Sequence, residues 1–133
     1  MSNTDAGVNN QIFRKDNPMI LAGRRDLASF VPVRLAYNAS GYVSGQALGL
    51  NSVSGQWQNY NDAGASGINT CVGILFDAID VSEFPSTTGT VAARMITGGE
   101  LFNDKLTGMD ANGRTDLGAR IVVDATGTNI LKF

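Results

Sequence analysis

The chain has 133 residues, of which 43% are hydrophobic and 17% charged, and its formal net charge is −2. This length is enough for one hydrophobic core, so we expect a single domain. Lys and Arg are few and scattered, which argues against the basic clusters that nucleic-acid binding needs, and no apolar run approaches the roughly 20 residues of a membrane-spanning helix.

The first 36 residues differ from the rest of the chain in charge. They contain five basic and three acidic residues, a net charge of +2, whereas residues 37–133 hold five basic and nine acidic residues, a net charge of −4. The apolar residues of this first part have no clear partner strand nearby. They therefore predict either an edge strand that packs on the domain itself or an arm that orders on a larger partner.

We favour an extended N-terminal arm over residues 1–30. Strand addition to a partner sheet would satisfy the backbone groups of such an arm, while its side chains would give specificity. Its first residues lack the basic and apolar regions of a secretory signal, so we expect the chain to fold in a cytoplasm. The predicted contact residues are the apolar anchors Ile12, Phe13, Met19, Ile20 and Leu21 and the basic residues Arg14, Lys15, Arg24 and Arg25, which would reach acidic groups.

Residues 31–133 carry the strand patterns of a single β-rich domain. Alternation over Val31–Tyr37 predicts a half-buried strand, and its proline predicts an edge position or a strand start. Ala47–Leu50 and Gln56–Tyr60 predict the two strands of a hairpin, with Val53–Gly55 in the connection.

The second half of the domain begins with its most apolar segments. Thr70–Ile79 is the longest apolar run and predicts a central buried strand, and Thr90–Thr97 predicts a second core strand. Asn103–Met109 is typical of a brief helical turn. Asp110–Gly113 predicts a plain turn in which Asn-Gly supplies a positive φ.

Two further strands, at residues 120–123 and 129–133, are predicted on either side of a turn at Gly127. The predicted fold class is mainly β: a small, compact, β-barrel-like domain with minimal helix and an extended N-terminal arm. A strand-rich chain of this size protects its exposed edges best by curling toward closure or by assembling with copies of itself.

The residues offer little material for catalysis. The chain has no histidine, which excludes Ser-His and Cys-His nucleophiles and the usual zinc sites. The single cysteine, Cys71, has apolar neighbours that predict a small core side chain. Asp77, Asp80 and Glu83 form a dense acidic cluster after a predicted strand, which is more typical of an exposed loop than of paired catalytic acids. We expect no enzyme, no metal site and no cofactor.

Several short motifs follow one another in an order that resembles a known family. They are Ser44–Gly49, Ser54–Trp57, Cys71–Leu75 with Asp77 and Asp80, Val91–Leu101 and Leu117–Ile121. In this order they resemble the lambda-type head decoration proteins of tailed bacteriophages, over about residues 41–123. That family has a glycine-flanked strand, a Ser-Gly-aromatic turn, a Val-Gly-Ile-Leu strand, a further strand and a final Leu-x-x-x-Ile element.

The resemblance implies a capsid decoration, or cement, protein. Such a protein would bind the outer surface of the expanded phage head as homotrimers, at threefold and quasi-threefold positions, and would stabilise the head against the pressure of packaged DNA. Its N-terminal arm would clamp the major capsid protein. The resemblance also implies synthesis in the host cytoplasm, a final location in the virion, and no direct contact with nucleic acid or membrane.

Three aromatic residues support an alternative function. If exposed, Trp57, Tyr60 and Tyr42 would form a stacking platform on a small β-sandwich binding module, which would bind glycans or belong to a phage tail or fibre. Packing in the core or at a trimer interface is the interpretation that we favour for them. A third class, an enzyme that uses Asp77 or Asp80, finds the least support.

Overall fold

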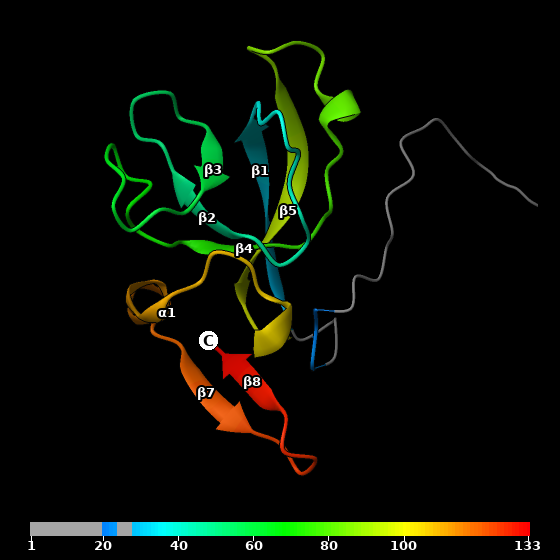
Figure 1. Cartoon of the computed structure of the whole chain (residues 1–133), viewed down its shortest axis with the longest axis vertical. Coiled ribbons are helices and arrows are strands. Elements are labelled where there is room, and N and C mark those ends of the chain that lie inside the picture. The colour runs from blue at the N-terminus through cyan, green and yellow to red at the C-terminus, as the bar shows by residue number, and fades with distance from the viewer. Residues whose placement is uncertain (1–19, 24–27) are drawn as a thin grey trace, which may run out of the picture.

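The computed structural model describes residues 20–23 and 28–133, which form a closed five-stranded barrel followed by a three-stranded sheet (Figure 1). The predicted mainly β, barrel-like fold with little helix is confirmed. The barrel order is β1-β3-β2-β4-β5, and β5 returns to β1. Its strands are β1 (Ser29–Ala36), β2 (Ala47–Leu50), β3 (Trp57–Asn59), β4 (Gly73–Leu75) and β5 (Thr90–Gly98).

β1 closes the barrel because it pairs on both sides. It lies antiparallel to β5 along its length and parallel to β3 at Leu35. Pro32 lies opposite Arg94 on β5. The backbone N–H and C=O of Arg94 bond on the other side of β5, to Asp77 and Phe76, so Pro32 and Arg94 form no hydrogen bonds with each other. The nitrogen of Pro32 therefore points away from β5, to a part of β1 that β3 does not reach, and the missing donor is tolerated there.

The predicted hairpin is confirmed, since β2 and β3 are antiparallel with Gly49 opposite Gln58. The long strand predicted over Thr70–Ile79 is wrong in extent, because only Gly73–Leu75 is strand. The pairing of this segment with β5 ends at Asp77, because the side chain of Asp77 accepts the hydrogen bond from the backbone N–H of Arg94 that a further strand residue would otherwise accept. The close approach of β4 to β5 also requires glycine, since a Cβ at Gly73 would lie 2.7 Å from the carbonyl oxygen of Ile96.

Two clusters of buried side chains lie on the two sides of the barrel strands. Leu75 and Met95 belong to the cluster that includes Leu35 and Leu48, whereas their neighbours Ile74 and Ile96 belong to a second cluster with Phe76 and Leu101. Successive side chains of a strand point to opposite faces. β4 is therefore buried on both faces, and so is β5 at Met95 and Ile96, whereas Ala92 and Thr97 of β5 are exposed.

The second sheet has the order β6-β8-β7 and is antiparallel throughout. Its strands are β6 (Glu100–Phe102), β7 (Arg120–Val123) and β8 (Asn129–Lys132), so the predicted C-terminal hairpin about Gly127 is confirmed. Figure 1 shows this hairpin at the end of the molecule away from the upper barrel strands. The described residues also include the 3-10 turns η2 (Val81–Glu83) and η3 (Asn103–Lys105), and η3 confirms the predicted brief helical turn.

The plain turn predicted over Asp110–Gly113 is wrong, because these residues begin the helix α1 (Ala111–Leu117). Asp110 caps this helix by accepting the backbone N–H of Gly113 at 2.7 Å. Gly113 is needed here for space and not for a positive φ, since a Cβ would lie 2.8 Å from the sulfur of Met109 and 3.1 Å from the ring of Tyr60. The helix ends at Gly118, which adopts the left-handed conformation with φ of 65°.

In the part of the chain that the structure describes, no helix combines the length and the apolar character that crossing a membrane requires.

Candidate functional site

The segment Ile20–Gly23 lies along the outer edge of β6 and joins it through one antiparallel β-bridge, between Leu21 and Leu101. Phe102 donates its backbone N–H to the carbonyl of Ile20 at 2.8 Å, and Ala22 donates to the carbonyl of Glu100 at 2.8 Å. The side chain of Ile20 is 4% exposed and belongs to the cluster between the barrel and the second sheet. This segment is therefore part of the folded domain.

Among the predicted arm residues, Ile20 and Leu21 are the ones that the structure describes. Leu21 forms an antiparallel bridge with Leu101, so both residues contact the domain itself, as the edge-strand interpretation of this segment predicted. Ile20 would have to leave the core to contact a partner. β1 also begins at Ser29, before the predicted boundary at residue 31. The other predicted contact residues lie outside the described residues: Ile12, Phe13, Arg14, Lys15, Met19, Arg24 and Arg25.

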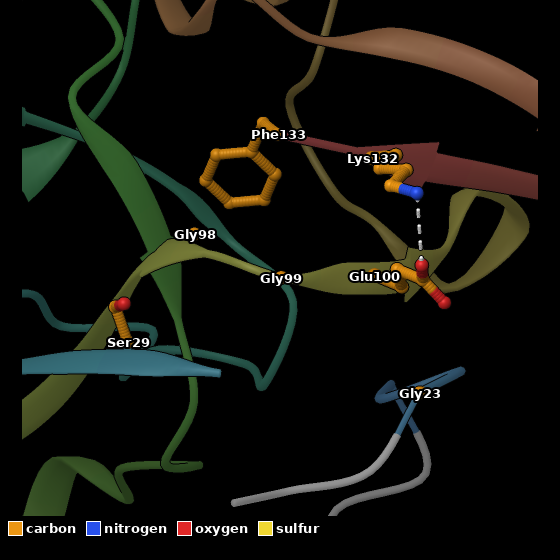
Figure 2. A pocket seen from close by; sticks show the side chains of 7 residues that line it. All are labelled: Gly23, Ser29, Gly98, Gly99, Glu100, Lys132 and Phe133. Atoms are coloured by element: carbon orange, nitrogen blue, oxygen red, sulfur yellow. Dashed lines mark ion pairs between the residues drawn. The ribbon is translucent and has the colours of Figure 1, made fainter. Parts of the chain in front are cut away.

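A pocket of about 540 Å³ lies beside this segment (Figure 2). Gly99 and Phe133 meet at its wall through two backbone hydrogen bonds, 2.8 and 3.1 Å long. Lys132 and Glu100 form an ion pair at 3.4 Å, and because both side chains are nearly half exposed, water weakens the attraction. The pocket offers an aromatic ring and backbone groups more than reactive side chains. Its lining residues are Gly23, Ser29, Gly98, Gly99, Glu100, Lys132 and Phe133.

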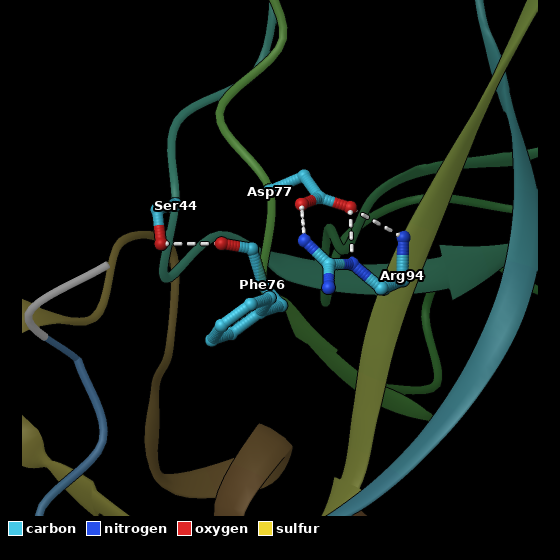
Figure 3. Close-up of polar contacts among 4 residues, drawn as sticks. All are labelled: Ser44, Phe76, Asp77 and Arg94. Atoms are coloured by element: carbon cyan, nitrogen blue, oxygen red, sulfur yellow. Dashed lines mark hydrogen bonds and ion pairs between the residues drawn. The ribbon is translucent and has the colours of Figure 1, made fainter. Parts of the chain in front are cut away.

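The carboxylate of Asp77 is buried, 1% exposed, and binds Arg94 in three ways (Figure 3). Its Oδ1 accepts from Nη2 of Arg94 at 2.6 Å, while Oδ2 accepts the backbone N–H at 2.8 Å and Nε at 3.2 Å. The guanidinium of Arg94 also lies 4.8 Å from the centre of the Phe76 ring, and Ser44 donates its hydroxyl to the carbonyl of Phe76 at 2.7 Å. This arrangement holds the end of β4 against β5.

The expectation that the acidic cluster is an exposed loop is therefore wrong for Asp77. The expectation is correct for Asp80, which is exposed and caps η2. The carboxylate of Asp80 accepts the backbone N–H and the hydroxyl of Ser82, and the carboxylate of Glu83 accepts the backbone N–H of Asp80. The bond from the Ser82 hydroxyl is the main cause that lowers the pKa of Asp80. Asp77 is bound by Arg94 on β5 and Asp80 by the nearby Ser82, so the cluster is not arranged as a pair of acids facing a substrate.

The hydroxyl of Tyr60 connects β3 to the helix α1. It lies 2.8 Å from Oδ1 of Asp110 and 3.3 Å from Oδ1 of Asp62. Burial and the bond to Asp110 raise the pKa of Tyr60, whereas the N–H of Gly113 and, second, the Tyr60 hydroxyl lower the pKa of Asp110. The sequence analysis missed this link, although aspartate is one of the residues preferred at a helix N-cap.

Cys71 is 2% exposed, so the prediction of a core side chain is confirmed. Burial raises the pKa of its thiol to about 12, and the carboxylate of Asp116 contributes to the same shift. Asp116 also accepts the backbone N–H of Cys71 at 2.9 Å. Since the thiolate is the reactive form of cysteine, this side chain is inert at neutral pH.

The aromatic platform of the alternative function does not form. Tyr42 and Tyr60 are each 5% exposed, and Trp57 packs partly buried against the cluster inside the barrel. Tyr42 donates its hydroxyl to the carbonyl of Ala36 at 2.7 Å, and burial raises its pKa to about 12. Tyr42 and Tyr60 pack in the core, as we favoured, and are not available for stacking on a sugar, whereas Trp57 is partly exposed.

The strand β7 is the most apolar of the exposed elements. All four of its residues are exposed, and Ile121, Val122 and Val123 are 39%, 39% and 61% exposed. The sequence analysis predicted this strand but not its position at the edge of the sheet, because the strand order depends on contacts distant in sequence.

Within residues 20–23 and 28–133, no three His, Cys, Asp or Glu side chains lie together in a way that would hold a metal ion. No family model matches the chain, and neither the curated proteins nor the solved structures contain a match to it. The features that the described residues offer are the segment Ile20–Gly23 beside β6, the pocket next to it, and the exposed edge strand β7.

Proposed function

We propose that this protein is a phage capsid decoration, or cement, protein. It binds the outer surface of the expanded head as homotrimers, contacts the major capsid protein through its N-terminal arm, and stabilises the virion against the pressure of packaged DNA. The observation that carries this proposal is the docking of Ile20–Gly23 on β6, which attaches the base of the arm to the core of the domain.

An attached base is what a mechanical role needs. A pull on the arm acts directly on the hydrogen bonds between Ile20–Gly23 and β6 and on the burial of Ile20, so the load is transmitted to the domain. The arm before this point supplies apolar and basic residues, while residues 37–133 carry a net charge of −4. Several such attachments in one trimer act together, so that modest contacts give tight binding.

The fold is also consistent with the resemblance that suggested this function. Ser44–Gly49 leads into β2, Cys71–Leu75 ends in β4, and Val91–Leu101 spans most of β5 and the start of β6. The motifs thus lie on neighbouring strands and their junctions. The order of these motifs along the chain is what suggested the function, and binding to a capsid is tested by experiment.

The direct test is to mix the purified protein with expanded, undecorated phage heads, to sediment them, and to count the copies bound per capsid hexamer. We expect saturation in multiples of three and greater resistance of the decorated heads to heat. The matched variant lacks residues 2–18 and keeps Ile20–Gly23, so that the domain retains its core. It should fold as the full chain does and fail to sediment with the heads. Equal attachment of both proteins, or attachment of neither to several related heads, would reject the proposal.

The basic residues of the arm give a second test of the same proposal. Reversing the charge of Arg24 and Arg25 should weaken attachment, and the attachment that remains should depend less on salt, because screening acts on the ion pairs that were removed. Reversal of the exposed Lys105 in η3, compared with reversal of Arg24 alone, is the control for overall charge, and reversal of both arginines should then have about twice the effect of Arg24 alone. If the double variant binds as the control does at every salt concentration, these arginines do not face acidic groups of the capsid.

A further inference from the structure

The outer edge of β7 is available for pairing. β7 pairs with β8 on one side, and no strand in the described part of the chain pairs with it on the other. All four residues of β7 are exposed, and its one charged residue, Arg120, stands at the first position, so Ile121–Val123 contain none of the charged residues or prolines that proteins commonly place on an edge to prevent pairing. An exposed edge with apolar side chains on both faces favours the addition of another strand.

The hydrogen bonds of the hairpin determine which backbone groups of β7 point outward. Asp124 donates its N–H to the carbonyl of Thr128 across the hairpin at 2.9 Å. In an antiparallel pair, residues that bond to the partner alternate with residues that do not. Val122 and Arg120 therefore bond toward β8, and Ile121 and Val123 direct both their N–H and C=O groups toward the free edge.

The charges at the two ends of this strand are complementary to each other. The sequence Arg120-Ile121-Val122-Val123-Asp124 begins with a cation and ends with an anion. Asp124 is held in place because its Oδ1 accepts the N–H groups of Thr126 and Thr128, each at 2.9 Å, and the hydroxyl of Thr126 at 2.7 Å. A second copy of this strand, aligned antiparallel, would therefore place its Asp124 opposite Arg120 of the first copy.

We propose that β7 pairs antiparallel with β7 of a second copy of this chain, about a twofold axis at Val122. In this register, Ile121 lies opposite Val123 of the second copy, and each such pair exchanges two backbone hydrogen bonds, so that four form in all. Arg120 lies opposite Asp124 of the second copy at both ends. The apolar side chains of the two strands then cover one another on both faces of a continuous sheet of six strands.

The register follows from the same geometry. A shift of one residue would place the outward groups of Ile121 and Val123 opposite residues whose groups point toward β8, and no ladder would form. A shift of two residues would keep some bonds but would place Arg120 away from Asp124. The centred register alone combines the full set of outward groups with both ion pairs.

This contact goes beyond the proposed function. A twofold contact uses the same patch on both copies, whereas a threefold ring requires two different patches. The β7 contact is therefore not the one that builds a trimer, and it would join chains of two neighbouring trimers. A single strand pair buries little area, so we expect a weak dimer whose population rises with protein concentration.

A cysteine placed at the twofold axis tests the register. Val122→Cys puts two thiols on facing residues of a pair without mutual hydrogen bonds, where Cα atoms are about 4.5 Å apart, within the range of a disulfide. Ile121→Cys is the control, because its counterpart lies two residues further along the strand and out of reach. Cys71 is buried and does not compete. Under mild oxidation we expect covalent dimers of the Val122 variant and none of the Ile121 variant; equal cross-linking of the two would overturn the register.

Sedimentation of the uncross-linked chain over a range of concentrations tests the contact itself. Val122→Lys places two like charges on the axis and should abolish the dimer, while Val53→Lys, at a residue that is 83% exposed on the β2–β3 turn, should leave it unchanged. Retention of the dimer by Val122→Lys, or a wild-type chain that stays monomeric at all concentrations, would overturn the proposal. Binding of phage heads by Val122→Lys is measured separately, so that failure of the β7 contact is distinguished from failure of the capsid function.

Discussion

The barrel and the three-stranded sheet differ in their strand edges: the barrel is closed, whereas the sheet has an exposed edge at β7. Each barrel strand has a neighbour on both sides, because β5 returns to β1. In the sheet, β6 has the segment Ile20–Gly23 on its outer side, and the outer side of β7 is exposed. Closure removes the edges at which other chains would add. We therefore expect the barrel to contribute most of the stability and the sheet to offer the edge for contact with other chains.

Two short strands make the difference concrete. β4, with the sequence Gly-Ile-Leu, is completely buried, whereas β7, with Arg-Ile-Val-Val, is exposed along its whole length. β7 has the higher β propensity, because Val and Ile favour strands and Gly does not, so propensity does not decide which of them lies in the core. The number of neighbouring elements decides it, because β4 lies between β2 and β5 with side chains packed on both faces.

The largest effect should come from a core residue beside β4. Phe76 is fully buried, contacts the ring of Phe30 edge-on at 5.1 Å between centroids, and supports the guanidinium of Arg94. We expect Phe76→Ala to lower the free energy of unfolding by about 3–5 kcal/mol, measured by urea denaturation. The matched change in the sheet, Val123→Ala, should cost less than about 1 kcal/mol. A similar loss for both variants would contradict the assignment of stability to the barrel.

The same comparison can be made with one ion pair from each region. Asp77 binds Arg94 from within the core, whereas Glu100 binds Lys132 at the surface of the sheet. Asp77→Ala leaves the backbone N–H and the guanidinium of Arg94 without this acceptor. We expect a loss of about 2–3 kcal/mol, below the value for a fully buried pair because the Arg94 side chain is 37% exposed.

The matched variant Glu100→Gln removes the charge from a pair that water already screens. It should change the unfolding free energy by less than about 0.5 kcal/mol, and still less at high salt. Both variants are compared by urea denaturation at low and high ionic strength. Equal costs at both sites would mean that burial of Asp77 does not control the strength of its interaction.

The base of the arm should give a smaller loss. Ile20 is the residue of the docked segment that is buried in the core, and Ile20→Ala should lower the unfolding free energy by about 2 kcal/mol, at the low end for such changes because the segment is short. Amide hydrogen exchange should rise at Ala22 and Phe102, whose N–H groups bond across to β6 and to Ile20. The control is Leu21→Ala, at a half-buried side chain. Unchanged exchange in the Ile20 variant would show that the segment is held by its backbone alone.

The sequence predicted local elements better than their neighbours. The β2–β3 hairpin and the hairpin about Gly127 were predictable because each is encoded within a dozen residues or so, by alternation and a turn. The burial of Asp77 was not predictable, because its partner Arg94 lies on another strand. In the sequence, Asp77 stands close to Asp80 and Glu83, and this spacing is typical of an exposed loop. The helix at Ala111 was missed for a related reason: Asn-Gly favours a turn locally, and the cap by Asp110 and the contact with Tyr60 overrode that preference.

The candidate site was predictable only in part. The apolar character of Ile20 and Leu21 was plain, but periodicity gives no sign of whether such residues pack on their own domain or on a partner. The exposed edge of β7 depends on the strand order β6-β8-β7, which no local pattern specifies. Both features are set by contacts between segments that lie far apart in the chain.

The smallest effect concerns acid, at the helix that lies between the two regions. The N–H of Gly113, and then the hydroxyl of Tyr60, hold the pKa of Asp110 below its usual value. A carboxylate whose pKa is lower in the folded state stabilises the fold above its unfolded pKa of about 3.9, and that contribution is lost as the pH falls through the folded pKa. The melting temperature should therefore fall below pH 4 in part through Asp110, with α1 loosening from Tyr60.

Asp110→Asn isolates this contribution, because asparagine also caps helices well but does not titrate. The variant should melt slightly below the wild type at pH 7 and should lose less of its melting temperature between pH 5 and pH 2. Asp104→Asn, at an exposed residue of η3, is the matched control and should follow the wild-type curve. If the Asp110 variant keeps the full wild-type slope, the acid response arises elsewhere in the fold. If its slope is reduced while core variants such as Phe76→Ala retain theirs, the response belongs to the contact between Tyr60 and α1.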